Sequence, residues 1–167
     1  MSKTTFTVQD DEKTLVVERL FQAPKSKVWS AWTNSELFVK WWGPRGWSTT
    51  VKHQDFTEGG YLLYGMKCED PEQEEWYGKY SWGKSTYKHI APEDTFSYTD
   101  EFTDENGTPA PGMPVMDITL ELREENGATR LVSITKFPSA EALKQTVEMG
   151  MEEGLTQTWD RLEEILS

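Results

Sequence analysis

The last part of the chain constrains the fold most. Residues 139–167 read SAEALKQTVEMGMEEGLTQTWDRLEEILS, contain no proline, and carry apolar side chains at steps of three and four residues. That spacing is typical of one face of an amphipathic helix, and Ser139 is suited to cap its start. A continuous helix of about 27 residues would extend for about 40 Å. Such a helix is long enough to cover the whole face of a β-sheet.

The rest of the chain is mainly β-rich. Runs of β-branched and aromatic residues are separated by Gly, Pro, Asn and Asp, which are typical of turns. The Asn126-Gly127 pair is the strongest hairpin signal. The predicted strands are 14–21, 47–56, 61–67, 75–90, 94–102, 114–124 and 128–137.

Two short helices are predicted between the first and second strands. Residues 24–33 have helical spacing with Pro24 at the first position, and residues 34–41 follow Thr33 and Glu36, which fit a capping box. The order of elements predicts the α+β class. We expect a curved, antiparallel, seven-stranded sheet wrapped around the long C-terminal helix, with the two short helices closing one end.

Length and charge exclude several classes of protein. A chain of 167 residues fits one domain, which we place at 1–167, with residues 1–12 polar enough to fray. Seventeen basic and 29 acidic residues give a net charge of −12, which disfavours binding to nucleic acid and leaves a basic protein partner or a cationic ligand open.

The cysteine and histidine counts argue against disulfides and metal sites. Cys68 is the only cysteine and there are two histidines, so we expect no metal and no cofactor. The N-terminus lacks the apolar segment of a signal peptide, and no run is long enough to insert into a membrane. A cytoplasmic location is the expectation.

Aromatic residues are abundant, with eight Trp, six Tyr and seven Phe. Side chains alternate between the two faces of a strand, so three consecutive strands are each expected to turn one apolar face toward the long helix. Glycines along the helix and strands would leave space there for a guest, although a solid aromatic core is the alternative. The three predicted inner sets are Trp76, Gly78, Tyr80 and Trp82; Phe96, Tyr98, Asp100 and Phe102; and Met116, Ile118, Leu120 and Leu122.

Residues 41–47, WWGPRGW, place three tryptophans around a Gly-Pro turn. One or two of Trp41, Trp42 and Trp47 are expected to wedge the second short helix onto the sheet. The remaining ring would then form the rim of a pocket. The sequence leaves open which ring does which.

Few residues suggest catalysis. His53 and Asp55 lie two apart on one predicted strand, an arrangement that often arises by chance, and the motifs of serine hydrolases and zinc proteases are absent. An enzyme that only orients a reactive chain would need a shaped pocket and one or two polar groups. The catalytic candidates for that case are Asp100, Tyr80 and Tyr98.

Several segments together resemble a known family. RLFQAPKSKVWSAWTNSELFVKWWGPRGW, HQDFTEGGYLLY, GKYSWGKSTYKHIAPEDTFSYTDEF and MEEGLTQTWDRLEEIL resemble the activator-of-Hsp90-ATPase-homologue (AHSA1-like) family, within the START-like (SRPBCC) helix-grip superfamily. The resemblance covers about residues 14–166. One departure is that Leu155 follows Gly154 and Trp159 comes four residues later, where the family usually has Trp first.

The resemblance implies a long helix gripped by the sheet with a cavity between them, and it implies function only in outline. Our first hypothesis is that the protein binds an apolar or aromatic small molecule. A cyclase-type enzyme using the same pocket, or a chaperone cofactor or protein-sequestering module, are the alternatives, and the chain is expected to be a monomer or a homodimer. The expected ligand-binding residues are Trp41, Trp42, Tyr64, Trp76, Tyr80, Trp82, Phe96, Tyr98, Met116, Val147 and Met151.

Overall fold

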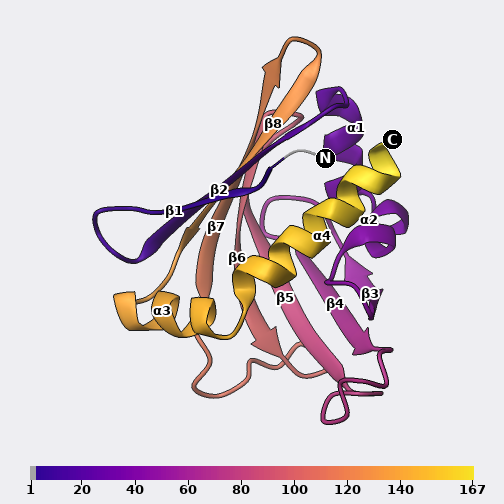
Figure 1. Cartoon of the computed structure of the whole chain (residues 1–167), viewed down its shortest axis with the longest axis vertical. Helices are drawn as coiled ribbons and strands as arrows, with labels where there is room; N and C mark the ends of the chain where they lie inside the picture. The colour runs from indigo at the N-terminus through magenta and orange to yellow at the C-terminus, as the bar shows by residue number, and fades with distance from the viewer. Residues whose placement is uncertain (1–2) are drawn as a thin grey trace.

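The chain forms a curved antiparallel sheet around a C-terminal helix, in a computed structural model that describes residues 3–167. The strands run across the sheet in the order β1-β2-β8-β7-β6-β5-β4-β3. Helix α4 crosses the concave face (Figure 1). The predicted α+β helix-grip arrangement is therefore confirmed. The strands are β1 (Thr5–Val8), β2 (Thr14–Phe21), β3 (Trp47–Gln54), β4 (Tyr61–Cys68), β5 (Tyr80–Ala91), β6 (Thr95–Thr103), β7 (Met116–Glu125) and β8 (Ala128–Lys136).

The sheet has eight strands rather than the predicted seven, because β1 adds a strand at one edge. Strand β1 lies within residues 1–12, which the sequence predicted to be frayed. Its Phe6 packs against the core, and the turn into β2 is held by Asp11. The Asp11 carboxylate accepts hydrogen bonds from the backbone amides of Lys13 at 3.0 Å and Thr14 at 2.9 Å. A short polar stretch thus becomes ordered through one partly buried ring and one turn.

The hairpin between β7 and β8 is the one that the sequence predicts. Asn126 and Gly127 have φ angles of +52° and +83°, as a two-residue hairpin turn requires. Glu125 and Ala128 pair on either side of the turn.

The two short helices after β2 also form, but their boundary is capped differently from the prediction. Asn34 Oδ1 accepts a hydrogen bond from the amide of Glu36 at 2.9 Å, so Asn34 is the N-cap of the second helix. The Thr33 hydroxyl instead donates back to the carbonyl of Trp29 at 2.9 Å, so the predicted Thr33–Glu36 capping box is wrong. The helices are α1 (Lys25–Thr33), α2 (Ser35–Trp41), α3 (Ala140–Glu148) and α4 (Met151–Leu166).

The predicted continuous C-terminal helix is broken into α3 and α4. Ser139 caps α3 as predicted, because its Oγ accepts from the amide of Ala142 at 3.1 Å. Gly150 then has φ +91°, a left-handed conformation that commonly ends a helix and that glycine adopts without strain. The apolar stripe continues across the break, which hid the break from the sequence pattern. Within residues 3–167, no helix is both long and apolar enough to cross a membrane.

Arg161 of α4 binds backbone carbonyls of the WWGP turn. The Arg161 guanidinium donates to the carbonyl of Gly43 at 2.7 Å. Gly43 itself has φ +97°, which allows the chain to reverse directly after α2. Arg161 thus holds the WWGP turn against α4. Further carbonyls within reach of Arg161 are those of Lys40, Trp42, Pro44 and Trp47.

Candidate functional site

A cavity of about 360 Å³ lies between α4 and the concave face of the sheet. Its volume falls within the range of small-molecule pockets. The sheet supplies one wall, α4 the second and the WWGP turn the third. The residues that line it are Leu15, Val17, Trp32, Trp42, Gly43, Pro44, Tyr64, Met66, Tyr98, Asp100, Phe102, Met116, Ile118, Ser133, Thr135, Phe137, Thr146, Met151, Gly154, Leu155, Thr158 and Trp159.

Space for the cavity comes from small residues on both walls. On α4, a Cβ atom added to Gly154 would meet no atom within 4 Å, so this glycine leaves an open groove in the helix surface. On β5, a Cβ atom at Gly83 would stand 2.6 Å from the Tyr64 ring. The Tyr64 ring therefore lies flat over Gly83 and sends its hydroxyl toward β6.

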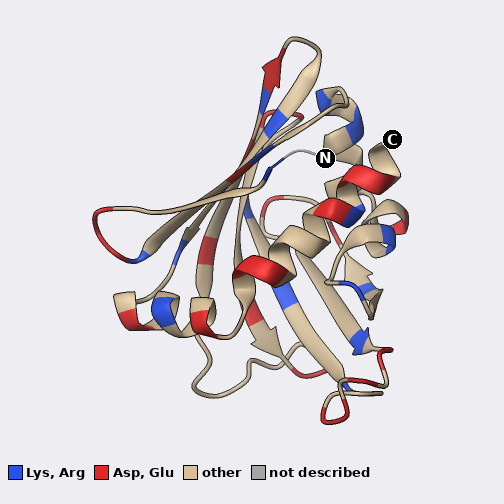
Figure 2. Cartoon of the chain, in the orientation of Figure 1, with Lys and Arg blue, Asp and Glu red and all other residues tan. Residues whose placement is uncertain are grey.

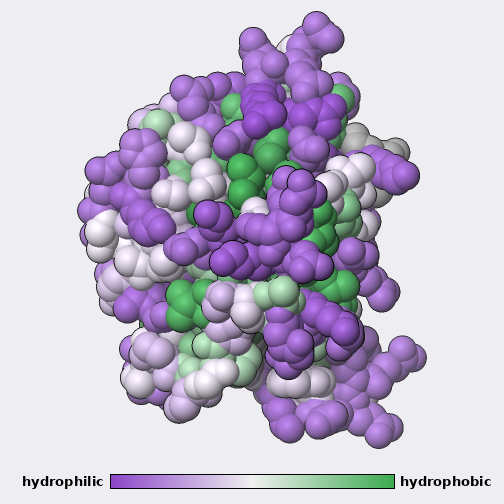
Figure 3. Space-filling view, turned by 90° about the vertical axis from the view of Figure 1, so that its left-hand side faces the viewer, coloured by the Kyte–Doolittle hydropathy of each residue, from purple (hydrophilic) through white to green (hydrophobic). Residues whose placement is uncertain are grey.

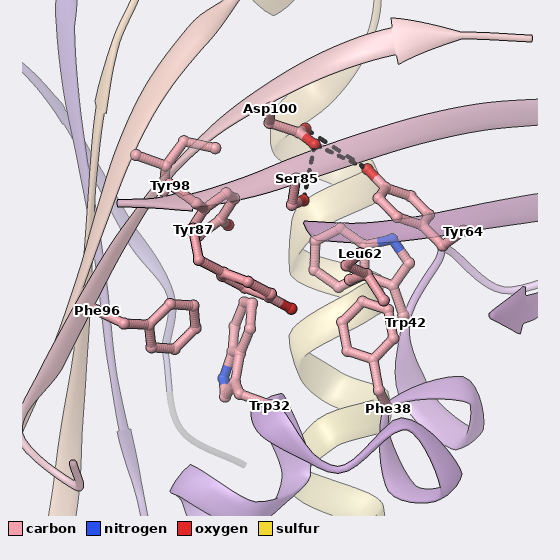
Figure 4. A pocket seen from close by; sticks show the side chains of 11 residues that line it. Trp32, Phe38, Trp42, Leu62, Tyr64, Ser85, Tyr87, Phe96, Tyr98 and Asp100 are labelled. Carbon is pink, nitrogen blue, oxygen red and sulfur yellow. Dashed lines mark hydrogen bonds between the residues drawn. The ribbon is translucent and has the colours of Figure 1, made fainter. Parts of the chain in front are cut away.

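Asp100 is the acidic group at the inner end of the site. Its Oδ1 accepts hydrogen bonds from Ser85 Oγ at 3.1 Å and from Tyr64 Oη at 3.3 Å (Figure 4). Burial raises the pKa of Asp100 to about 7, although the two hydrogen bonds act in the opposite direction. Burial, with the Asp100 charge adding to it, also holds the pKa values of Tyr64 and Tyr98 well above their usual range. The site thus contains a carboxyl group that can gain or lose a proton near neutral pH.

An aromatic cluster at the α1–α2 end closes the site. A smaller cavity of about 50 Å³ lies here and shares Trp32, Trp42, Tyr64, Tyr98 and Asp100 with the larger one. Rings meet mainly edge to face, as in the Trp42–Tyr64 pair, whose planes are 82° apart. The indole nitrogens of Trp32, Trp42 and Trp159 are buried and have no hydrogen-bond acceptor among the described residues.

Six of the predicted ligand-binding residues do line these cavities: Trp42, Tyr64, Phe96, Tyr98, Met116 and Met151. The structure also places Asp100 there. Trp41 instead lies in the core with no exposed surface, and its Nε1 donates to the carbonyl of Ala31 at 2.9 Å. Val147 is partly buried against the core on α3 and is absent from the lining.

The predicted inner face of residues 76–82 is wrong. Strand β5 begins only at Tyr80, so the alternation cannot be counted from Trp76, which is 49% exposed in the preceding turn. A Cβ atom at Gly65 would stand 2.6 Å from Trp82, whereas its neighbour Tyr64 lines the cavity. Trp82 therefore lies on the convex face, where its ring stacks with Tyr80 at 5.5 Å.

The residues of β5 that face inward are Gly83, Ser85 and Tyr87. None of them was among the predicted site residues. Ser85 and Tyr87 line the smaller cavity. In the first half of β5 the buried positions are Gly83 and Ser85, whereas the aromatic Tyr80 and Trp82 lie on the more exposed face, so aromatic content pointed to the wrong face. The helix residues Leu155, Thr158 and Trp159 were also missed, although their spacing from Gly154 could have indicated them.

His53 and Asp55, the two residues considered as an acid–base pair, do not contact each other through a hydrogen bond in the described structure. A bulge separates Val51 from His53 in the pairing of β3 with β4, and the His53 ring stacks on Tyr61 at 4.3 Å. Asp55 is engaged locally, because its carboxylate accepts from the Thr57 hydroxyl at 3.0 Å.

The fold and the sequence place the chain in a known family. The family model described as Activator of Hsp90 ATPase homolog 1-like protein matches residues 22–167. The chain belongs to this family. In the comparison with curated proteins, nothing matches.

Solved structures agree with this assignment to the AHSA1-like family. The crystal structure of protein Ms6760 from Mycobacterium smegmatis is 28% identical, with a TM-score of 0.86 over 99% of this chain and 98% of that one. A solution structure of a protein from Arthrobacter aurescens is 28% identical, with a TM-score of 0.86 over 97% and 90%. One from Staphylococcus epidermidis is 31% identical, with a TM-score of 0.81 over 96% and 93%. Family and fold are established together, whereas the guest has to be inferred from the cavity.

Proposed function

We propose that this AHSA1-like domain binds an apolar small molecule with an aromatic ring system, held between α4 and the sheet. The observation that carries the proposal is the cavity of about 360 Å³, which combines apolar walls with one ionisable carboxyl group. Hiding about 250 Å² of a guest's apolar surface is worth roughly 6 kcal/mol before ordering costs. That gain alone corresponds to a dissociation constant of about 40 μM, so hydrogen bonds to the guest have to add to it for micromolar affinity.

The cavity favours this function over a protein-interaction module. A module of that kind would use a filled core and a broad exposed apolar surface. On the face seen in Figure 3, apolar residues are interrupted by hydrophilic ones. Among the described residues, the exposed aromatic side chains are Trp76, Tyr77, Tyr80 and Phe102.

A cyclase-type enzyme is the second candidate, favoured by one observation. A carboxyl group with a pKa of about 7 is well matched to proton transfer near neutral pH. Asp100 also lies beside Tyr64 in the cavity wall. An enzyme of this kind would lose turnover in Asp100→Asn while still binding its substrate.

Gly154 offers a direct test of small-molecule binding. Leucine at this position would fill the cavity from the helix side, since nothing lies within 4 Å of an added Cβ atom. Replacing a helical glycine by alanine or leucine also adds about 0.5–1 kcal/mol of helix stability. We therefore expect Gly154→Leu to block binding while folding at least as stably as the wild type.

The measurement is a fluorescence titration with the neutral probe N-phenyl-1-naphthylamine, exciting tryptophan and recording energy transfer. Wild type and the matched control Gly154→Ala should both show saturable binding, and Gly154→Leu should bind at least about tenfold more weakly, a loss of about 1.4 kcal/mol. Urea unfolding of the three proteins reports stability. Unchanged affinity in Gly154→Leu would mean that the probe binds elsewhere, and the proposed function would then be wrong.

A further inference from the structure

The polar groups of the cavity wall are mostly oriented as hydrogen-bond acceptors. The hydroxyls of Tyr64 and Ser85 both donate to Asp100. On the helix side, the Thr146 hydroxyl donates to the carbonyl of Ala142 at 2.9 Å, and that of Thr158 donates to the carbonyl of Gly154 at 2.8 Å. A hydroxyl that has used its hydrogen in this way presents only lone pairs to a guest.

Asp100 has acceptor capacity to spare. Its Oδ1 receives both of the shorter hydrogen bonds, whereas Oδ2 has only a long contact of 3.5 Å with Tyr64 Oη. An ionised carboxylate offers about four acceptor positions. Asp100 is only partly exposed, so an ionised carboxylate with so few hydrogen-bond partners is costly there.

Positive charge is missing from the cavity wall. The lining contains no Lys, Arg or His among the described residues, and Asp100 is its only carboxylate. The indole nitrogens of Trp32, Trp42 and Trp159 are buried, and the three rings pack against neighbouring rings. An anionic guest would thus meet no cationic side chain and only the hydroxyls of Tyr98, Ser133 and Thr135 as donors, whereas Asp100 is an acceptor for a cation.

The outside of the molecule has the same sign. The net charge is −12, and acidic residues occur along α3 and α4 (Figure 2). Glu152 and Glu153 in the first turn of α4 stand beside Met151 and Gly154, which line the cavity. A field of this sign draws cations toward the cavity and repels anions.

From these observations we propose that the cavity is selective for amines: an aromatic body fills the apolar space, and a protonated amino group pairs with Asp100 Oδ2. This inference rests on the proposed function and narrows its class of ligand. An ammonium group supplies the donors that the wall lacks, and a charge-assisted hydrogen bond to Asp100 stabilises both buried charges.

Selectivity should depend on pH through Asp100. The groups facing it are Tyr64 from β4, Ser85 from β5 and Tyr98 from β6, while β7 presents only apolar side chains there and α4 presents no charged one to the cavity. The charge of the neighbouring Glu101 also raises the pKa of Asp100. Both tyrosine pKa values are raised well above the usual range, so these phenols stay neutral. The pKa of Asp100 is about 7. Amine affinity should therefore rise about tenfold per pH unit below pH 7 and level off above it.

The test compares three probes with the same naphthalene body: 1-naphthylmethylamine, 1-naphthalenemethanol and 1-naphthoate. At pH 8, calorimetry with the wild type should give the amine the highest affinity, about tenfold or more above the alcohol, with the carboxylate weakest. Asp100→Asn should remove the amine's advantage and its pH dependence while leaving alcohol binding within about threefold. Retained alcohol binding also shows that this variant is folded.

Glu101→Gln is the matched control at pH 8: it removes the same formal charge from the next residue of β6, whose side chain lies on the other face of the strand, and the Glu101 charge only raises the pKa of Asp100, so Asp100 stays ionised there in the variant. It should keep the amine preference, since Glu101 is not in the cavity lining. Equal affinity for amine and carboxylate in the wild type, or an unchanged amine preference in Asp100→Asn, would overturn the inference. If N-phenyl-1-naphthylamine and the alcohol still bind and Gly154→Leu blocks them, only the amine selectivity fails. If neither neutral probe binds, the proposed function fails with it.

Discussion

Asp100 shows how one residue can trade stability for a binding site. Hydrogen bonds from Ser85 and Tyr64 recover part of the cost of its burial, yet the net effect is a pKa raised to about 7. A purely structural position would be better filled by an apolar or amide side chain. The residue therefore makes most sense where a guest completes its interactions.

The raised pKa of Asp100 predicts how the stability of the folded protein changes with pH. A carboxyl group whose pKa is higher in the folded state adds its full stability only below the unfolded value of 3.8, and loses it as pH rises to about 7. The asparagine variant has no such loss. We expect Asp100→Asn to gain stability relative to the wild type between pH 4 and pH 7, on the order of a few kcal/mol, with no further gain above pH 7.

Urea unfolding of both proteins at pH 4.5 and pH 8 measures this difference, because the other titrating groups are common to the two proteins. An equal difference at both pH values would show that Asp100 titrates normally in the folded state.

The three tryptophans of WWGPRGW illustrate what single residues reveal in a sequence. The structure places Trp41 in the core and Trp42 in the cavity wall. Trp47 starts β3 and its ring lies 6.3 Å from that of Trp76. The sequence of the turn was enough to predict that at least one ring packs between α2 and the sheet and that another lines the pocket. Which ring takes which place depends on the angle of α2 to the sheet, which no local pattern encodes.

At the scale of elements, hydrogen bonds and an ion pair join α4 to the WWGP turn. Arg161 donates to the carbonyl of Gly43 at 2.7 Å, and the amide of Arg45 donates to Gln157 Oε1 at 3.1 Å. The Arg45 guanidinium also pairs with Glu164 at 2.6 Å. Because α2 ends at this turn, the same contacts fix the end of α2 and one wall of the cavity.

We predict that Arg161→Met destabilises the protein by about 2 kcal/mol, the usual value of a hydrogen bond to a charged group. The methionine keeps the apolar stem of the side chain and removes only the donors, so the loss reports the carbonyl contacts. The control is Arg123→Met, which removes an exposed ion pair with Glu121 and should cost less than about 1 kcal/mol. Chemical denaturation gives both values, and equal effects would contradict the role of Arg161.

The type and order of most elements could be predicted from the sequence, while their ends could not. Periodicity identified the C-terminal helices, but an apolar stripe that continues through Gly150 gave no sign of the break. Turn residues identified β5 without showing that it begins at Tyr80, and the aromatic residues Tyr80 and Trp82 lie on its convex face rather than on the predicted inner one. Side-chain alternation succeeded on β6, where Phe96 and Tyr98 both line the smaller cavity.

At the scale of the whole molecule, the cavity results from how a curved sheet meets a straight helix. The sheet contacts α4 at its β2 side through Arg19, which pairs with Asp160 at 2.7 Å, and at the WWGP turn through Arg161. Gly154 precedes both attachments on α4 and leaves the helix surface open. A family with this architecture can change its guest by changing a few wall residues without rebuilding the fold.

The central claim is that the space beneath α4 receives a guest, and the indole N–H signals of the eight tryptophans offer the most direct measurement. We would titrate ¹⁵N-labelled protein with 1-naphthalenemethanol and follow these signals by NMR, assigned through single Trp→Phe variants. The account predicts saturable shifts for Trp32, Trp42 and Trp159, which line the cavity, and unchanged signals for Trp76 and Trp82. Shifts confined to Trp76 and Trp82, or no shift at all, would contradict it.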